Sequence, residues 1–157
     1  MDLTHLHPMI VHFPIALLIV GFLSDIVGLT TKREFFSQVG FLMLVLGTLG
    51  LVAAYLSGEQ AGEGITEAGA LKQALETHEG SATLTLWLVS IAAGFRIALV
   101  LFKKYKGAIK MLSLTLFFLG VLAIARTGYY GGELVFKHAA GVQLDLGFGF
   151  GDPATGD

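Results

Sequence analysis

Four long apolar stretches limit what this chain can fold into more than any other feature of the sequence. They run from about Pro8 to Leu29, Ser37 to Ser57, Ser81 to Phe102 and Ile109 to Tyr130. A bilayer core of about 30 Å requires roughly 20 apolar residues per helix, so each stretch is long enough to cross it. None of them shows the polar face that a helix of a soluble protein carries. The sequence therefore predicts an all-α integral membrane four-helix bundle.

The composition supports this class and excludes others. Only 14% of the residues are charged and the mean hydropathy is +0.74, whereas soluble domains carry about 25% charged residues. The net charge of −2 provides no basic field for nucleic acid. The absence of cysteine excludes disulfides, thiolate metal sites and iron–sulfur clusters. Because no catalytic motif is recognised, an electron-transfer or binding protein is favoured over a stand-alone enzyme.

The connections between the spans indicate an orientation. The first connection contains Lys32 and Arg33, and the third, "KKYKGAIK", contains four lysines. Lys and Arg of short loops concentrate on the cytoplasmic side of a membrane. We therefore expect a multi-pass protein of the inner (plasma) membrane with both basic connections in the cytoplasm. Both termini and the long acidic connection then face the periplasm or the cell exterior.

The segments outside the spans predict two further features. The acidic connection contains "ITEAGALKQALETHEG", a sequence rich in helix-forming residues, and predicts a short amphipathic helix between the second and third spans that runs into the third span. The tail "GVQLDLGFGFGDPATGD" is rich in glycine and predicts a flexible or loosely extended segment. The expected organisation is a transmembrane domain over residues 1–142 and a tail over residues 143–157.

All five histidines fall at the predicted outer end of the bundle. His12 is the most unusual, because it lies inside an apolar run, where a buried polar group needs a partner. Pro14 leaves the carbonyl of Ile10 without its usual donor, and we expect the resulting kink to turn His12 toward the bundle. His5 is explained as a terminal residue and His7 as a possible helix cap.

Three uses of such histidines remain open. A b-type haem takes axial histidines from different helices, and a Cu or Zn ion takes three or four imidazoles or carboxylates. In a structural membrane subunit of a larger complex, the histidines would only fix helix ends. The candidate cofactor ligands are His7, His12, His78 and His138, and the candidate ligands of a metal ion are His12, His78 and His138.

The haem interpretation also predicts a pocket and a counter-charge. The first, third and fourth spans would form the pocket, with Phe13, Leu17 and Phe136 as its apolar lining. Arg126 lies at the depth of the histidines, and a buried arginine needs an anion. A haem propionate, a lipid phosphate or a nearby glutamate (Glu59 or Glu133) could supply that anion.

Two other charged residues, Asp25 and Arg96, lie near the inner ends of their spans. Both side chains can reach the headgroup region from there. We expect them to form a structural ion pair near the lipid headgroups.

Several motifs resemble a family of bacterial membrane proteins, the domain of unknown function 2231 family. "LHPMIVHFPIALL" resembles the opening of that family, "LSGEQAG" and "THEGSA" its glycine-rich turn and loop histidine, and "GYYGGELVFKHAAGV" its closing signature. The resemblance covers Leu6 to Val142 and implies four membrane helices, with His7, His12, His78 and His138 as characteristic polar positions. Similar domains joined to Rieske-type or cytochrome-type modules imply electron transfer at the outer face. Quinone or an external redox protein is the implied partner, and a homo-oligomer or a larger complex is a further expectation.

Overall fold

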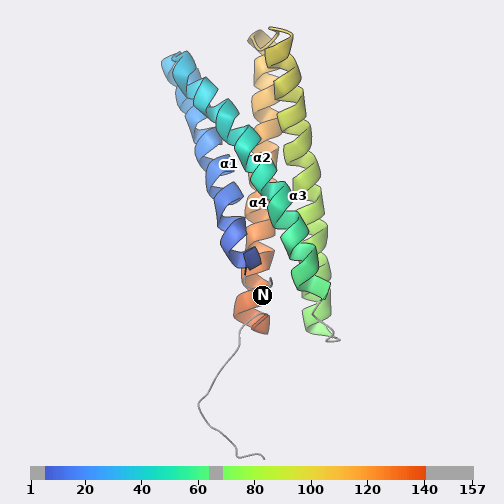
Figure 1. Cartoon of the computed structure of the whole chain (residues 1–157). Coiled ribbons are helices and arrows are strands. Elements are labelled where there is room, and N and C mark those ends of the chain that lie inside the picture. The colour runs from blue at the N-terminus through green and yellow to red at the C-terminus, as the bar shows by residue number, and fades with distance from the viewer. Residues whose placement is uncertain (1–5, 64–68, 141–157) are drawn as a thin grey trace, which may run out of the picture.

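A computed structural model describes residues 6–63 and 69–140 and folds them into four long helices (Figure 1). Each helix is long and apolar enough to cross a membrane, and no strand occurs within these two ranges. The predicted all-helical architecture is confirmed. The helices are α1 (Leu6–Thr31), α2 (Glu34–Glu63), α3 (Ala70–Leu101) and α4 (Gly107–His138).

The helices extend beyond the apolar windows, which corrects two expectations. The predicted short amphipathic helix is not confirmed as an element of its own, because residues 70–80 form the first turns of α3 and join the span without a break. Gly80 lowers helix propensity but retains its backbone donor, so it does not end the helix. At the other end, α4 continues to His138 instead of ending near Tyr130. The predicted tail, residues 143–157, lies outside the described residues.

The bundle consists of two helical hairpins. α1 packs chiefly along α2, and α3 along α4, while the contacts between the hairpins run through α2 with α3 and α1 with α4. Figure 1 shows the hairpins diverging toward the end that carries the short connections. The residues that join the two hairpins therefore decide how the four helices are held together.

The core is a narrow apolar column between the helices. On α1 the buried positions recur every three to four residues, which is one face of a helix. They are Pro14, Leu18, Gly21, Asp25 and Gly28. The apolar cluster at the centre of the bundle consists of Leu18, Leu44, Leu51, Val89, Ala93, Phe117 and Ile124.

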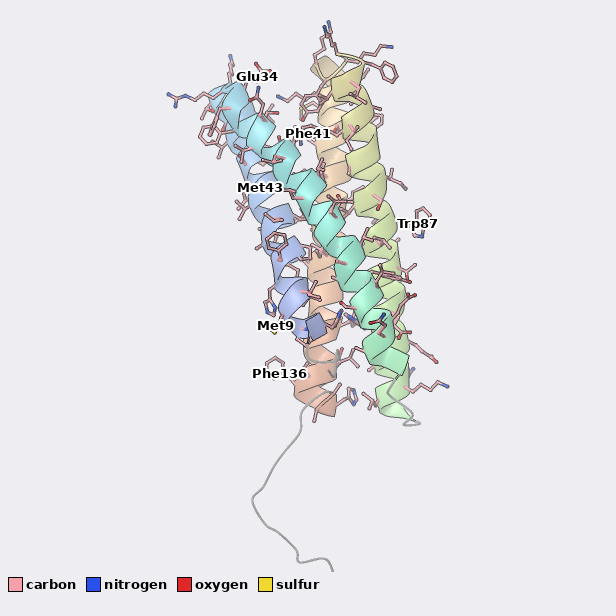
Figure 2. The ribbon with its side chains drawn as sticks, in the orientation of Figure 1. Met9, Glu34, Phe41, Met43, Trp87 and Phe136 are labelled. Atoms are coloured by element: carbon pink, nitrogen blue, oxygen red, sulfur yellow. The ribbon has the colours of Figure 1, made fainter. Side chains whose placement is uncertain are left out.

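Large apolar side chains are exposed along the outer surface of the bundle. Met9, Trp87 and Phe136 are 72%, 64% and 90% exposed, and Figure 2 shows the Trp87 side chain directed away from the helices. Large exposed apolar surfaces are rare on soluble monomers. With all backbone hydrogen bonds made inside helices, this surface suits lipid.

Glycine allows the closest approach between α1 and α2. A Cβ atom at Gly40 would lie 2.6 Å from Cγ of Asp25 and 2.8 Å from both of its carboxylate oxygens. We expect Gly40→Ala to lower the free energy of unfolding by about 1–3 kcal/mol, because Asp25 is held by an ion pair and cannot move aside.

Gly94→Ala is the matched control, because a Cβ atom at Gly94 would meet nothing within 4 Å. Gly94→Ala should change the free energy of unfolding by less than about 1 kcal/mol. Thermal unfolding of both variants in one detergent measures the difference. Equal losses in the two variants would contradict the close approach at Gly40.

Candidate functional site

Two of the histidines, one from each hairpin, lie at the end of the bundle where α1 begins. His7 lies in the first turn of α1, and His78 lies in the third turn of α3. Both side chains are half-buried, and each bonds to the other helix of its own hairpin. The two hairpins thus each present one imidazole to the same region.

The hydrogen bonds of His7 fix which ring nitrogen carries the proton. Its Nδ1 lies 3.0 Å from Oγ of Ser57 on α2. The Ser57 hydroxyl donates its own hydrogen to the Ala54 carbonyl at 2.9 Å. With that hydrogen on the Ala54 carbonyl, Ser57 accepts from His7, and in this arrangement His7 carries its proton on Nδ1 and has a lone pair on Nε2.

His78 has the same arrangement with a different partner. Its Nδ1 lies 3.2 Å from the backbone carbonyl of Thr127 on α4. A carbonyl oxygen only accepts, so Nδ1 of His78 carries the proton and Nε2 again holds the lone pair. The Thr127 hydroxyl forms a 2.8 Å hydrogen bond with Thr85, which lies seven residues after His78 on α3. This bond ties α3 to α4 beside the imidazole.

Glycines stand against both imidazole rings. A Cβ atom at Gly58 would lie 2.8 Å from Cε1 of His7, and one at Gly131 would lie 3.2 Å from Cε1 of His78. A side chain at either position would press on the ring. These glycines let each ring lie directly against a helix backbone.

The prediction that Pro14 turns His12 toward the bundle is wrong. His12 is exposed, and its Nδ1 donates to the Pro8 carbonyl one turn earlier. The helix phase explains the error, since two residues rotate a helix by about 200° and Pro14 itself occupies the buried face.

The predicted apolar lining of a haem pocket is found only in part. Phe13 is 59% exposed and Phe136 is 90% exposed, so neither lines the interior, whereas Leu17 is partly buried.

His138 is half-buried at the last position of α4. It follows Gly131, the residue beside the His78 ring, by seven positions, or about 10 Å along the axis. Within residues 6–63 and 69–140, no group of three or more His, Asp or Glu side chains is placed to hold a metal ion. The structure thus does not bring His12, His78 and His138 together, and cofactor binding at these positions stays a prediction.

Arg126 is exposed on α4, with its guanidinium 5.4 Å from the centre of the Tyr130 ring. Of its predicted carboxylate partners, Glu133 pairs with Lys137 instead, one turn away on the same helix. No ion pair joins Arg126 to Glu59 in the described part of the chain. The expected burial of Arg126 is thus not observed, and a haem propionate or a lipid phosphate as its partner stays a prediction.

The oxygen and glycine partners of the two histidines are not predictable from the sequence pattern. Ser57 and Thr127 carry no motif of their own, and only the packing of α2 and α4 brings them to the rings. One signal for His7 was present in the sequence. His7, Pro14, Gly21 and Gly28 are spaced by seven residues, which places His7 on the close-packed face of α1.

A second polar group, the inner polar cluster, lies at the opposite end of the bundle and consists of Asp25, Arg96 and Ser37. Arg96 holds the Asp25 carboxylate through both terminal nitrogens, and its Nη2 lies 2.8 Å from Oδ1 and 2.7 Å from the Ser37 carbonyl. The predicted pairing is confirmed. Both residues are only 1% exposed, so the pair lies inside the bundle, and its expected level near the lipid headgroups stays a prediction. The space left by Gly40 allows the carboxylate to lie inside the bundle.

Comparison with known proteins identifies a family. A family model described as "Predicted membrane protein (DUF2231)" matches residues 4–144 of the chain. No curated protein and no solved structure matches it significantly.

Proposed function

The chain belongs to the DUF2231 family of predicted membrane proteins, and on that premise we propose that it is an electron-transfer protein that holds a b-type haem between His7 and His78. One observation carries the proposal. Each imidazole donates from Nδ1 to a fixed oxygen, so that each Nε2 lone pair is available to a metal. Histidine ligands of metals are usually oriented by such a second hydrogen bond.

The number of ligands favours haem over a bare metal ion. A structural zinc site takes four protein ligands and a catalytic one takes three. The described part of the chain assembles no such set. A haem iron needs only two protein ligands, because the porphyrin supplies four nitrogens. Two imidazoles from two hairpins therefore fit a haem better than they fit Cu or Zn.

Electron transfer follows from the pair of ligands. When two histidines fill both axial positions, no coordination position remains for oxygen or another substrate. The partner would then be a quinone from the bilayer or a redox protein of the cytochrome or Rieske type at the membrane surface. In this proposal Arg126 meets a haem propionate, since a guanidinium suits a carboxylate.

The orientation of the chain decides where that partner lies. The basic connections after α1 and α3 favour a cytoplasmic location for their end of the bundle. The histidine end would then face outward. This is the predicted inner-membrane topology with both termini outside.

Single cysteines test the orientation directly, because the chain contains no cysteine of its own. We expect Thr31→Cys and Lys106→Cys to resist an impermeant thiol reagent in intact cells, and Glu76→Cys to react. All three positions are exposed. The reverse pattern would move the histidine end to the cytoplasm.

An optical spectrum tests the cofactor. Protein purified from cells supplied with haem is expected to show a Soret band and about one haem per chain. A colourless protein under the same conditions would exclude the haem proposal. Copper and zinc analysis of that sample then separates the two alternatives: bound metal at one ion per chain indicates a metal-binding protein, and its absence indicates a structural subunit.

A further inference from the structure

A pocket of about 280 Å³ opens at the end of the bundle opposite the paired histidines, between α2, α3 and the connection after α3. Its walls include Phe41 and Glu34 of α2, Arg96 of α3, and Lys103 and Tyr105 of the connection. Figure 2 shows Glu34 and Phe41 toward this end of the molecule and Met9 and Phe136 toward the other. The proposed haem site does not use this pocket.

Two buried donors of the pocket have no protein partner. The Nη atoms of Arg96 are used by Asp25 and Ser37, but its Nε has no hydrogen-bond partner among the described residues. The hydroxyl oxygen of Tyr105 is likewise buried without one. Buried polar atoms in folded proteins are nearly always hydrogen-bonded. Both donors line one pocket, which indicates a bound group that accepts from both.

Tyr105 is able to serve as such a donor at neutral pH. Burial raises the pKa of its hydroxyl above the usual value and the Asp25 carboxylate adds to this increase, while Arg96 and the nearby Ser37 side chain, which lies outside hydrogen-bond geometry, oppose it. The hydroxyl therefore stays protonated. The Tyr105 ring also lies 4.8 Å from the guanidinium carbon of Arg96, so the two side chains are held together.

We propose that this pocket binds a phosphate group, whose oxygens accept from Nε of Arg96, the Tyr105 hydroxyl and the ammonium of Lys103. A phosphate offers several acceptor oxygens, and arginine and lysine are its usual protein partners. Phe41 and Val100 provide apolar walls beside these donors. The phosphate can come from the headgroup of an anionic phospholipid or from free inorganic phosphate.

The charges around the pocket suit an anion. Asp25 balances the charge of Arg96, but Lys103 lines the pocket, and Lys104, Lys106 and Lys110 follow in the sequence. Glu34 opposes them from an exposed position at the start of α2, where water screens its charge. Basic pockets between membrane helices on the cytoplasmic side bind anionic headgroups.

The test uses delipidated protein in detergent and two variants. Tyr105→Phe removes the hydroxyl and keeps the ring, and Arg96→Lys keeps the positive charge beside Asp25 but removes Nε. Tyr55→Phe is the matched control, since it removes a tyrosine hydroxyl that bonds Thr83 outside this pocket. Binding is measured by native mass spectrometry and by the shift of the unfolding temperature on adding phosphatidylglycerol, phosphatidylcholine or inorganic phosphate.

We expect wild-type protein to bind phosphatidylglycerol or inorganic phosphate, and Tyr105→Phe and Arg96→Lys to bind about tenfold more weakly, as for the loss of one hydrogen bond to a charged group. Tyr55→Phe should bind like wild type. Preference for phosphatidylglycerol over inorganic phosphate identifies a lipid site, and the reverse identifies a free-anion site.

A second readout separates binding from a structural role. Without ligand, Tyr105→Phe should be as stable as wild type or slightly more stable, because it removes an unpaired buried hydroxyl. If neither phosphatidylglycerol nor inorganic phosphate stabilises the wild type, the pocket holds water only and the proposal is overturned. Unchanged affinity in both Tyr105→Phe and Arg96→Lys would overturn it equally.

Discussion

Asp25→Ala is expected to lower the free energy of unfolding by about 3–5 kcal/mol, because it leaves the Arg96 guanidinium buried without its counter-charge. The pair joins α1 to α3 and thereby links the two hairpins near the end where they diverge. Reversible unfolding of the purified protein in mixed detergent micelles measures the loss. Asp25→Leu combined with Arg96→Met should recover most of it, since the double variant buries no unpaired charge.

The exposed pair of Glu133 and Lys137 provides the matched control. It is also an ion pair of opposite charges, but its lysine lies mostly outside the bundle. Lys137→Ala should change the free energy of unfolding by less than about 1 kcal/mol, because exposed ion pairs contribute little. If Asp25→Ala cost no more than Lys137→Ala, the inner polar cluster would not hold the hairpins together.

Haem occupancy is expected to be lost in His7→Ala and in His78→Ala and retained in His12→Ala. The first two variants each remove a proposed iron ligand, whereas His12 is exposed and bonds to its own helix. Ser57→Ala removes only the oxygen that orients His7, and should weaken haem binding by about 10–100-fold. Titration of each apoprotein with haem, followed in the Soret region, measures the affinities.

His138→Ala serves as a second control, because His138 lies at the same end of the bundle but about 10 Å along α4 from Gly131, the residue beside the His78 ring. Retained haem in His7→Ala together with lost haem in His12→Ala or His138→Ala would transfer the ligand role to those residues. It would also require the helices to rotate or slide from the arrangement described above.

The sequence predicted the fold well because the bilayer sets a simple rule. Backbone N–H and C=O groups inside a bilayer must form their hydrogen bonds within the chain. Four apolar windows of sufficient length therefore imply four helices. The helix ends were less predictable, since polar turns such as residues 70–80 continue a helix as readily as they end one.

The candidate site was predictable in part. The sequence placed the histidines at one end of the bundle, but it did not give the rotation of each helix. The position of His12 deeper in the apolar run favours it as a ligand over His7. The seven-residue spacing from Pro14 favours His7 instead. The oxygens that orient the rings come from α2 and α4. Their contribution depends on packing between helices, which no local pattern contains.

The burial of the inner polar cluster shows the same limit. The sequence indicated that Asp25 and Arg96 could pair, and the structure confirms it. Their burial depends on Gly40, which follows Asp25 by fifteen positions and lies on the facing helix. A missing side chain on one helix thus makes room for a charge on another.

The electron paramagnetic resonance spectrum of the oxidised protein tests the proposed function most directly, because it reports the ligands of the iron. Wild-type protein loaded with haem is predicted to give a low-spin signal, as expected for iron between two imidazoles, and His7→Ala and His78→Ala are each predicted to convert or abolish it. A high-spin signal in the wild type, or a low-spin signal that persists unchanged in both variants, would contradict haem ligation by His7 and His78.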